Sequence, residues 1–149
     1  MQYSVQPDEI VGFIYFLTRT TQEQQQAWLE KYPELKKTNF EHLLTENRQK
    51  SGPSLARLFN FIEDIKDVTT LYDILDDYPD KNVDINKMKE TVKSVWPIYH
   101  SFYQQNAKEL RHCAKQADKF MNNTAIESLK NVAQFYNYDM PSNYTVKHV

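Results

Sequence analysis

The sequence predicts an all-α fold, a single-domain bundle of about seven or eight helices that covers residues 1–149. Apolar residues recur every three or four positions through most of the chain, which is the spacing of one helix face. The chain holds only 2 glycines, too few for the many turns and bulges of a sandwich or barrel. Its 149 residues are enough for one domain with a core of its own.

The run IVGFIYFL, residues 10–17, is predicted to form the central helix of the bundle. Pro7 suits the first helical position, because a residue there needs no N–H donor. A buried strand is the competing interpretation of the same run. The helical interpretation rests on apolar side chains that cover most of the circumference, as in a helix surrounded by others: Ile10, Val11, Phe13, Ile14, Phe16 and Leu17.

Two capping boxes predict the next two helices. Thr21 with Gln24 marks the start of one, which Pro33 ends, and Thr38 with Glu41 marks the start of the other. The apolar faces that follow the two boxes are Ala27, Trp28 and Tyr32, then Phe40, Leu43 and Leu44.

The stretch SGPS, residues 51–54, is the clearest break in the chain. Pro53 can open a helix, Thr69 or Thr70 can cap a short one, and Asp84 can cap the next. The apolar stripes of these three helices are Leu55, Leu58, Phe59, Ile62 and Ile65, then Leu71, Ile74, Leu75 and Tyr78, then Ile85, Met88, Val92 and Val95.

The C-terminal part is predicted to be a long helix that is kinked or broken near Pro97. A proline inside a helix removes one backbone hydrogen bond and clashes with the preceding turn, at a cost of about 3 kcal/mol. Asn122 and Asn123 are predicted to end this helix. Thr124 with Glu127 is a third capping box and predicts one more helix.

Residues 138–149, YDMPSNYTVKHV, differ from the rest of the chain. They are polar and aromatic and contain a proline. They are predicted to form an extended tail in which TVKHV resembles the start of a strand without a partner. Such a tail could be a truncated junction to a further domain.

Composition and charge narrow the function classes. A net charge of −2 gives no general attraction to nucleic acid or to an anionic membrane. The longest apolar run, residues 10–17, is too short for a membrane span, which needs about 20 residues. One cysteine excludes an internal disulfide and a four-cysteine zinc site. The single cysteine and the lack of a signal-peptide pattern favour a cytoplasmic location, although a cleaved signal peptide stays compatible with the sequence.

The stretch KELRHCAKQADKF, residues 108–120, contains the only cysteine and a Glu-x-x-His pair. Glu109 and His112 have the spacing of ligands in di-iron bundles, but His112 points away from the apolar stripe and a second such pair is missing. The pair is predicted to be solvated, and no metal ligand is assigned. Cys113 is predicted to be a small core residue rather than a reactive thiol. It falls in an apolar stripe with Leu110, Ala114, Ala117, Phe120 and Met121.

DKNVDINKMKE, residues 80–90, resembles the start of an EF-hand loop, because Asp80, Asn82 and Asp84 match its first three ligand positions. The glycine of the sharp turn is replaced by Ile85, and the twelfth position is Thr91 instead of glutamate. Calcium binding is therefore not predicted. The surrounding acidic region, 63–90, is predicted to be a solvated face. The alternative is a face for a basic partner, through Asp73, Asp76, Asp77 and Asp80.

Trp96, Tyr99, Phe102 and Tyr103 cluster at core spacing and are predicted to be core residues, with the wall of a binding groove as the alternative. The four histidines are scattered, and no G-x-S-x-G, H-E-x-x-H or glycine-rich phosphate loop occurs. No catalytic residue and no cofactor are therefore predicted.

The order of features resembles the helical N-terminal region of bacterial gluzincin-type zinc peptidases. An extended YSVQPDE leads into the apolar helix VGFIYFLT, aromatic-rich amphipathic helices follow, and the chain turns extended at NYTVKHV. In that family the zinc helix with its H-E-x-x-H motif lies further toward the C-terminus. The motif is missing from this sequence, so no catalytic residue is carried over. The resemblance implies the helical part of a larger enzyme, without activity of its own.

The sequence thus predicts a non-catalytic domain that acts through contacts with another protein or with the remainder of its own chain. Neither a nucleic-acid partner nor a membrane span is predicted. The alternative is the helical N-terminal region of a bacterial zinc metallopeptidase. A third class, a helical enzyme with an unrecognised site, would show a deep polar pocket with titratable groups of shifted pKa.

Overall fold

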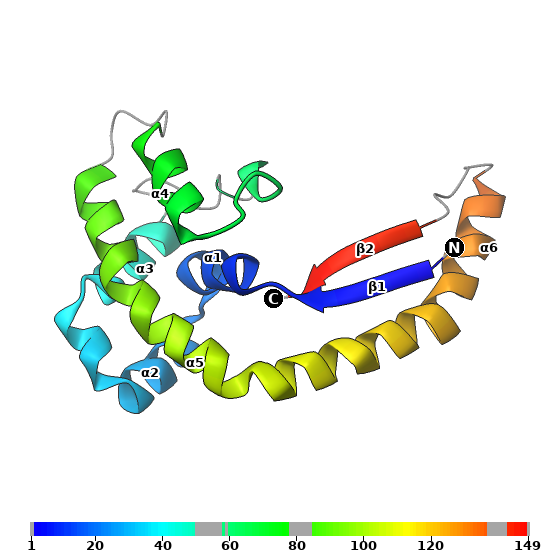
Figure 1. The fold of residues 1–149 in the computed structure, drawn as a ribbon, viewed down its shortest axis with the longest axis horizontal. Helices are drawn as coiled ribbons and strands as arrows, with labels where there is room; N and C mark the ends of the chain where they lie inside the picture. Colours follow the sequence, from blue (N-terminus) through cyan, green and yellow to red (C-terminus); the bar gives the residue numbers. More distant parts are fainter. Residues whose placement is uncertain (1, 50–57, 59, 78–84, 137–142, 149) are drawn as a thin grey trace. The chain divides into compact units, whose positions relative to one another are not determined.

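The computed structural model of the chain describes residues 2–49, 58, 60–77, 85–136 and 143–148. Most of these residues are helical, which confirms the predicted fold class. The elements (Figure 1) are β1 (Gln2–Pro7), α1 (Glu9–Arg19), α2 (Gln22–Lys31), the 3₁₀ helix η1 (Pro33–Lys37), α3 (Phe40–Gln49), α4 (Val68–Asp76), α5 (Ile85–Phe120), the π turn η3 (Met121–Ala125), α6 (Ile126–Phe135) and β2 (Asn143–His148).

The described residues form five α-helices instead of the predicted seven or eight, when α5, η3 and α6 are counted as one continuous helix. Asn122 and Asn123 do not end it. The backbone N–H of Ile126 bonds to the carbonyl of Met121, which is the i to i+5 pattern of a π turn, so the chain inserts a residue without leaving the helix. Thr124 does not cap α6, since the backbone before it is already helical.

Helix α5 also runs through Pro97, so a break at this proline is wrong, while a kink stays a prediction. Val92, Val95 and Tyr99 lie on either side of the proline and are buried. Burying a large apolar side chain contributes about 1.5–3 kcal/mol. Three such residues can offset the roughly 3 kcal/mol that an interior proline costs, which explains why the helix continues.

The helix predicted to open at Pro53 lies partly outside the described residues. The described part differs from it: residues 58 and 60–61 are in a 3₁₀ conformation and 62–64 form a turn. Leu58 and Ile65 are fully buried all the same. The apolar pattern therefore identified core residues correctly, although the backbone between them is not a regular helix. The predicted cap Asp84 also lies outside the described residues.

The chain divides into two compact units. One consists of residues 9–104, and the other of residues 1–8 together with 105–149. They are called here the bundle unit and the strand unit. Helix α5 contributes residues to both. Two compact units can belong to one domain or to two, so the single-domain organisation stays a prediction.

The core of the bundle unit is built around α1. Phe13, Ile14 and Leu17 are fully buried, and Val11 and Phe16 nearly so, which confirms the central helix and contradicts the alternative of a strand. Phe16 stacks on Phe40 of α3 with ring centroids 4.8 Å apart. Other fully buried side chains come from η1, α3, the 58–65 segment, α4 and α5: Leu35, Leu44, Leu58, Ile65, Leu71, Leu75 and Val92.

Of the predicted capping boxes, the one that begins α2 is confirmed. The Gln24 N–H donates to Thr21 Oγ1 at 3.2 Å, and the Thr21 N–H donates to Gln24 Oε1 at 3.0 Å. Thr38 instead accepts a hydrogen bond from the N–H of Phe40 at 3.2 Å, and its hydroxyl donates to the carbonyl of Leu35 at 2.7 Å. Thr38 therefore joins η1 to α3 instead of forming the predicted box.

The cap of α4 is Asp67 and not Thr69 or Thr70. Asp67 Oδ1 accepts the backbone N–H of Thr70 at 2.8 Å and its hydroxyl at 2.9 Å. These bonds, above all the one from the backbone, favour the ionised carboxylate and lower the pKa of Asp67 from its ordinary value of 3.8. Both threonines lie inside the first turn, where Thr70 supplies donors instead of accepting one.

In the strand unit, β1 and β2 lie side by side as a parallel pair (Figure 1), from Gln2 opposite Asn143 to Pro7 opposite His148. The described part of the predicted extended tail is thus extended, but the prediction that its strand lacks a partner is wrong. Pro7 ends β1 and does not open a helix. The pairing joins the two ends of the chain, and no local sequence pattern could reveal it.

Candidate functional site

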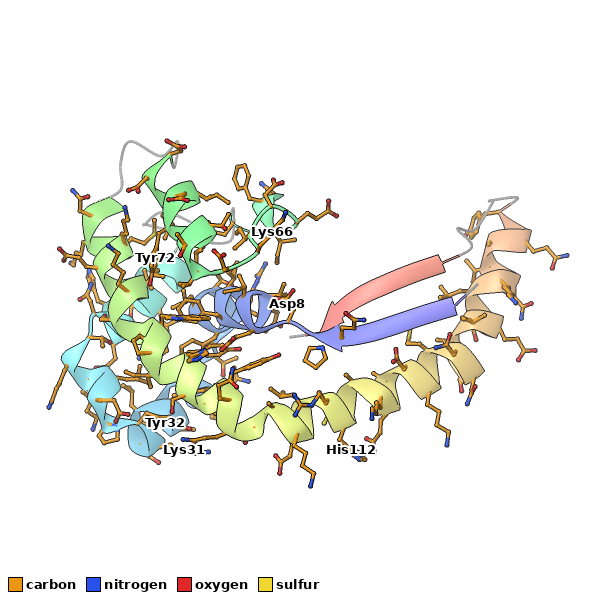
Figure 2. All side chains as sticks on the ribbon, viewed as in Figure 1. Asp8, Lys31, Tyr32, Lys66, Tyr72 and His112 are labelled. Carbon is orange, nitrogen blue, oxygen red and sulfur yellow. The ribbon has the colours of Figure 1, made fainter. Side chains whose placement is uncertain are left out.

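The bundle unit contains an open groove between the C-terminal end of α2 and the middle of α5. The groove has a volume of about 260 Å³. Its lining residues are Ala27, Trp28, Lys31, Tyr32 and Phe102. Lys31 and Tyr32 lie together at this end of α2 in Figure 2.

Three aromatic rings form the walls of the groove. Trp28 and Tyr32 are four residues apart, so one ring lies above the other, with centroids 5.2 Å apart and planes at 28°. Phe102 meets both rings edge-on, with its centroid 4.7 Å from that of Trp28 and 6.4 Å from that of Tyr32. Edge-on and offset arrangements are the favourable ones for aromatic pairs. The groove therefore has stable apolar walls from two helices.

Trp28 also connects the groove to the core. Its ring lies 4.6 Å from that of Phe16 and 6.4 Å from that of Tyr99, both of which are buried. Leu29, the next residue on α2, is buried as well and anchors the same helix. A side chain packed against a close-packed core moves little, so the wall of the groove is held in position before any ligand arrives.

Lys31 is the only charged residue that lines the described groove. Its Nζ lies 5.6 Å from the ring centroid of Tyr32 and 5.9 Å from that of Phe102, within the range of cation–π contacts. Lys31 also lies in the last turn of α2, where a cation is favoured by the helix dipole. Both effects hold the ammonium group at the edge of the aromatic walls.

The predicted aromatic cluster, Trp96, Tyr99, Phe102 and Tyr103, fits both of its interpretations: core residues, and the wall of a binding groove. Tyr99 is buried, and Trp96 and Tyr103 pack against the core as predicted. Phe102 packs there too, but it also lines the groove, which was the alternative. The sequence presented Trp28 and Tyr32 as one apolar face, but it gave no reason to place Lys31 or Phe102 beside them.

The residues 108–120 behave differently from the prediction in one respect. Cys113 is exposed, so its placement in the core is wrong. Of the predicted stripe only Ala114 is buried, while Phe120 is 59% exposed. Only part of the apolar stripe is therefore covered by other residues. Cys113 lies at the margin of the stripe, in the part that is exposed.

Glu109 and His112 are both exposed, as predicted. His112 Nε2 is 2.9 Å from the amide nitrogen of Gln116, one turn further along α5. The side chain of His112 is thus engaged along its own helix face. No group of three or more His, Cys, Asp or Glu side chains that could hold a metal occurs among the described residues.

The first half of the EF-hand-like stretch, with Asp80, Asn82 and Asp84, lies outside the described residues. The second half is helical, because α5 begins at Ile85. Thr91, in place of the final ligand, is buried, and its hydroxyl donates to the carbonyl of Lys87 at 2.9 Å. A helical backbone from Ile85 onward removes the turn that such a loop needs at this position.

The described aspartates of the acidic region are exposed, as predicted for Asp73, Asp76 and Asp77. Asp76 forms an ion pair with Lys89 and so joins α4 to α5. Beside it, Lys93 Nζ lies 5.4 Å from the ring centroid of Tyr72, and burial raises the pKa of the Tyr72 phenol. The Asp76–Lys89 ion pair and the contact of Lys93 with Tyr72 therefore both connect α4 to α5 on this face.

A second hollow, of about 340 Å³, lies against the exposed side of α5 and is lined by Asn86, Lys89, Glu90 and Lys93. All four residues come from one helix, and Lys89 is already paired with Asp76. The side chain of Glu9 at the start of α1 lies 2.6 Å from His100 Nδ1. This contact joins residues 91 positions apart, and no local sequence pattern indicates it. Neither feature has the preformed walls of the aromatic groove.

None of the described helices is both long and apolar enough to cross a membrane. Comparison with known proteins gives no match to a protein family, a curated protein or a solved structure. The function is therefore argued from the groove itself.

Proposed function

We propose that the chain is a non-catalytic protein-interaction domain that holds an apolar side chain of its partner in the aromatic groove. The observation that carries this proposal is the arrangement of Trp28, Tyr32 and Phe102 around a preformed hollow. Tryptophan and tyrosine are enriched among the residues that dominate binding energy at protein interfaces. Rigid rings also lose little conformational freedom when a partner docks.

The size of the groove supports a side chain as its occupant. A closed apolar cavity of about 150 Å³ accommodates benzene, whereas pockets for drug-sized molecules have about 300–1,000 Å³. A groove of about 260 Å³ suits one large side chain better than a whole cofactor. Burying such a side chain contributes about 1.5–3 kcal/mol, so the partner must make further contacts around the groove.

The proposal is tested by filling the groove without disturbing the core. Ala27 is exposed and lines the groove, so Ala27→Tyr places a ring in the space that the partner would use. The matched control is Gln22→Tyr, which adds the same ring on an exposed position of α2 that does not line the groove. Both variants should unfold at nearly the same temperature as the original chain.

Partners are captured with a photoreactive benzoylphenylalanine in place of Gln26, close to the groove, or in place of Lys66 as a distant control. Lys66 lies well apart from Lys31 and Tyr32 in the bundle unit (Figure 2). We expect a protein that is cross-linked from position 26 and lost when Ala27→Tyr is added. A partner captured equally well with the groove filled would show that the groove is not the binding site.

The helical N-terminal region of a zinc metallopeptidase stays as a second proposal. Its support is that both extended segments of the resemblance, near the start and near the end of the sequence, are strands. The reading frame of the gene tests it: an H-E-x-x-H motif encoded beyond Val149 would favour the peptidase. A stop codon directly after Val149 would remove the basis for this proposal.

A further inference from the structure

The charge at the edge of the groove indicates what lies next to the apolar side chain of a partner. The Lys31 ammonium forms no ion pair with any carboxylate of the described residues. Glu30, its neighbour in sequence, accepts a hydrogen bond from the side chain of Gln26 at 3.1 Å instead. Two rings hold the ammonium at its position, yet they leave its N–H donors open to solvent.

An ammonium placed beside apolar walls favours one kind of ligand and opposes another. A carboxylate next to the bound side chain would find a donor already in place, in surroundings where water is partly displaced. A cationic group would be repelled by the Lys31 ammonium, which already contacts the rings of Tyr32 and Phe102. Complementary charge of this kind mainly selects among partners and adds less to the affinity.

We infer that the groove recognises a protein segment in which a large apolar residue stands beside an aspartate or glutamate, with Lys31 as the residue that selects the acidic neighbour. This inference rests on the proposed function of the groove. A single-stranded nucleic acid also combines flat apolar groups with negative charge. It is disfavoured, because such sites use several cations along a groove, and among the described residues that line this groove Lys31 is the one cation.

The experiment is a selection from a displayed library of short random peptides. Each pool is depleted on the Ala27→Tyr variant, so that only peptides that need the open groove remain. The original chain should enrich peptides with Leu, Ile, Met or Phe next to Asp or Glu. Lys31→Met should enrich the same apolar residues without the acid, and Lys31→Glu should enrich Lys or Arg in its place.

One selected peptide is then measured with its acidic residue changed to the matching amide. An exposed ion pair is worth about 0.2–1 kcal/mol, so the amide should bind about 1.4-fold to 5-fold more weakly. The difference should vanish in Lys31→Met, persist in the control Lys66→Met, and shrink when salt is raised from about 0.01 M to about 1 M.

The outcomes separate the inference from the proposed function. If the selected peptides need the open groove but are not enriched in Asp or Glu, the inference is overturned and the groove remains a binding site. The same holds if the enrichment in Asp or Glu persists in Lys31→Met. A library that yields no groove-dependent peptide would overturn both. Binding of a short oligothymidine that Ala27→Tyr abolishes, without any selected peptide, would assign the groove to nucleic acid and overturn both as well.

Discussion

The close approach of Tyr99 to α1 gives the sharpest test of the packing that holds the groove. A Cβ atom added at Gly12 would overlap severely with the Tyr99 hydroxyl oxygen. It would lie 3.6 Å from Cζ of the same ring, which is an ordinary contact. The substitution Gly12→Ala should therefore be destabilising because of one atom, the hydroxyl oxygen of Tyr99.

The expected magnitude follows from two opposing effects. Replacing a glycine inside a helix by alanine stabilises the helix by about 0.5–1 kcal/mol. Overpacking a filled core costs about 1–3 kcal/mol. The Tyr99 ring cannot move away easily, because it is 6% exposed and lies 5.1 Å from the ring of Phe13 and 5.3 Å from that of Phe16. We expect Gly12→Ala to reduce the free energy of unfolding by about 1 kcal/mol.

The assay is urea unfolding followed by tryptophan fluorescence, for Gly12→Ala, Tyr99→Phe and the double variant. Without the hydroxyl oxygen, the added methyl should fit and Gly12→Ala should become stabilising by about 0.5–1 kcal/mol. Tyr103→Phe, which removes a hydroxyl from the same face of α5, should not rescue Gly12→Ala. If Gly12→Ala stabilises the chain while Tyr99 is intact, the tight packing of α1 on α5 is refuted.

Three further predictions concern single residues outside the groove. The lowered pKa of Asp67 means that its cap is fully effective above pH 3.8 and is lost as the pH falls through the lowered value. Thermal melts should therefore show a fall in stability at acidic pH that is smaller in Asp67→Asn, and identical profiles would contradict the cap. Pro97→Ala restores an N–H to an unbroken helix and should raise the free energy of unfolding by up to about 3 kcal/mol in urea. A decrease would mean that the proline shapes α5 for packing. Cys113, being exposed, should react with Ellman's reagent in the native chain as fast as in urea, and protection until unfolding would restore its predicted place in the core.

The candidate site was only partly predictable from the sequence. Trp28 and Tyr32 were visible as one face of a helix, because side chains four residues apart lie on the same side. Phe102 was visible as a member of an aromatic cluster with two interpretations. Their meeting around one groove depends on how α2 packs against α5, and Lys31 became relevant only through its two ring contacts.

The sequence by itself determined the helical fold class, the central position of α1 and the apolar residues of the core, since these follow from a periodicity that any buried helix must have. It could not determine how far helices extend. Asn122 and Pro97 are local helix breakers, but a π turn and buried neighbours keep the backbone helical through both.

Only the tertiary structure decided which parts of an apolar stripe are covered and which distant segments meet. Cys113 is exposed, since none of the segments that the structure describes covers that margin of its helix, and β1 pairs with β2, which lies more than 130 residues later in the sequence. Periodicity records which side of a segment is apolar. Burial also depends on the surface that packs against that side, and this surface comes from residues far away in the sequence.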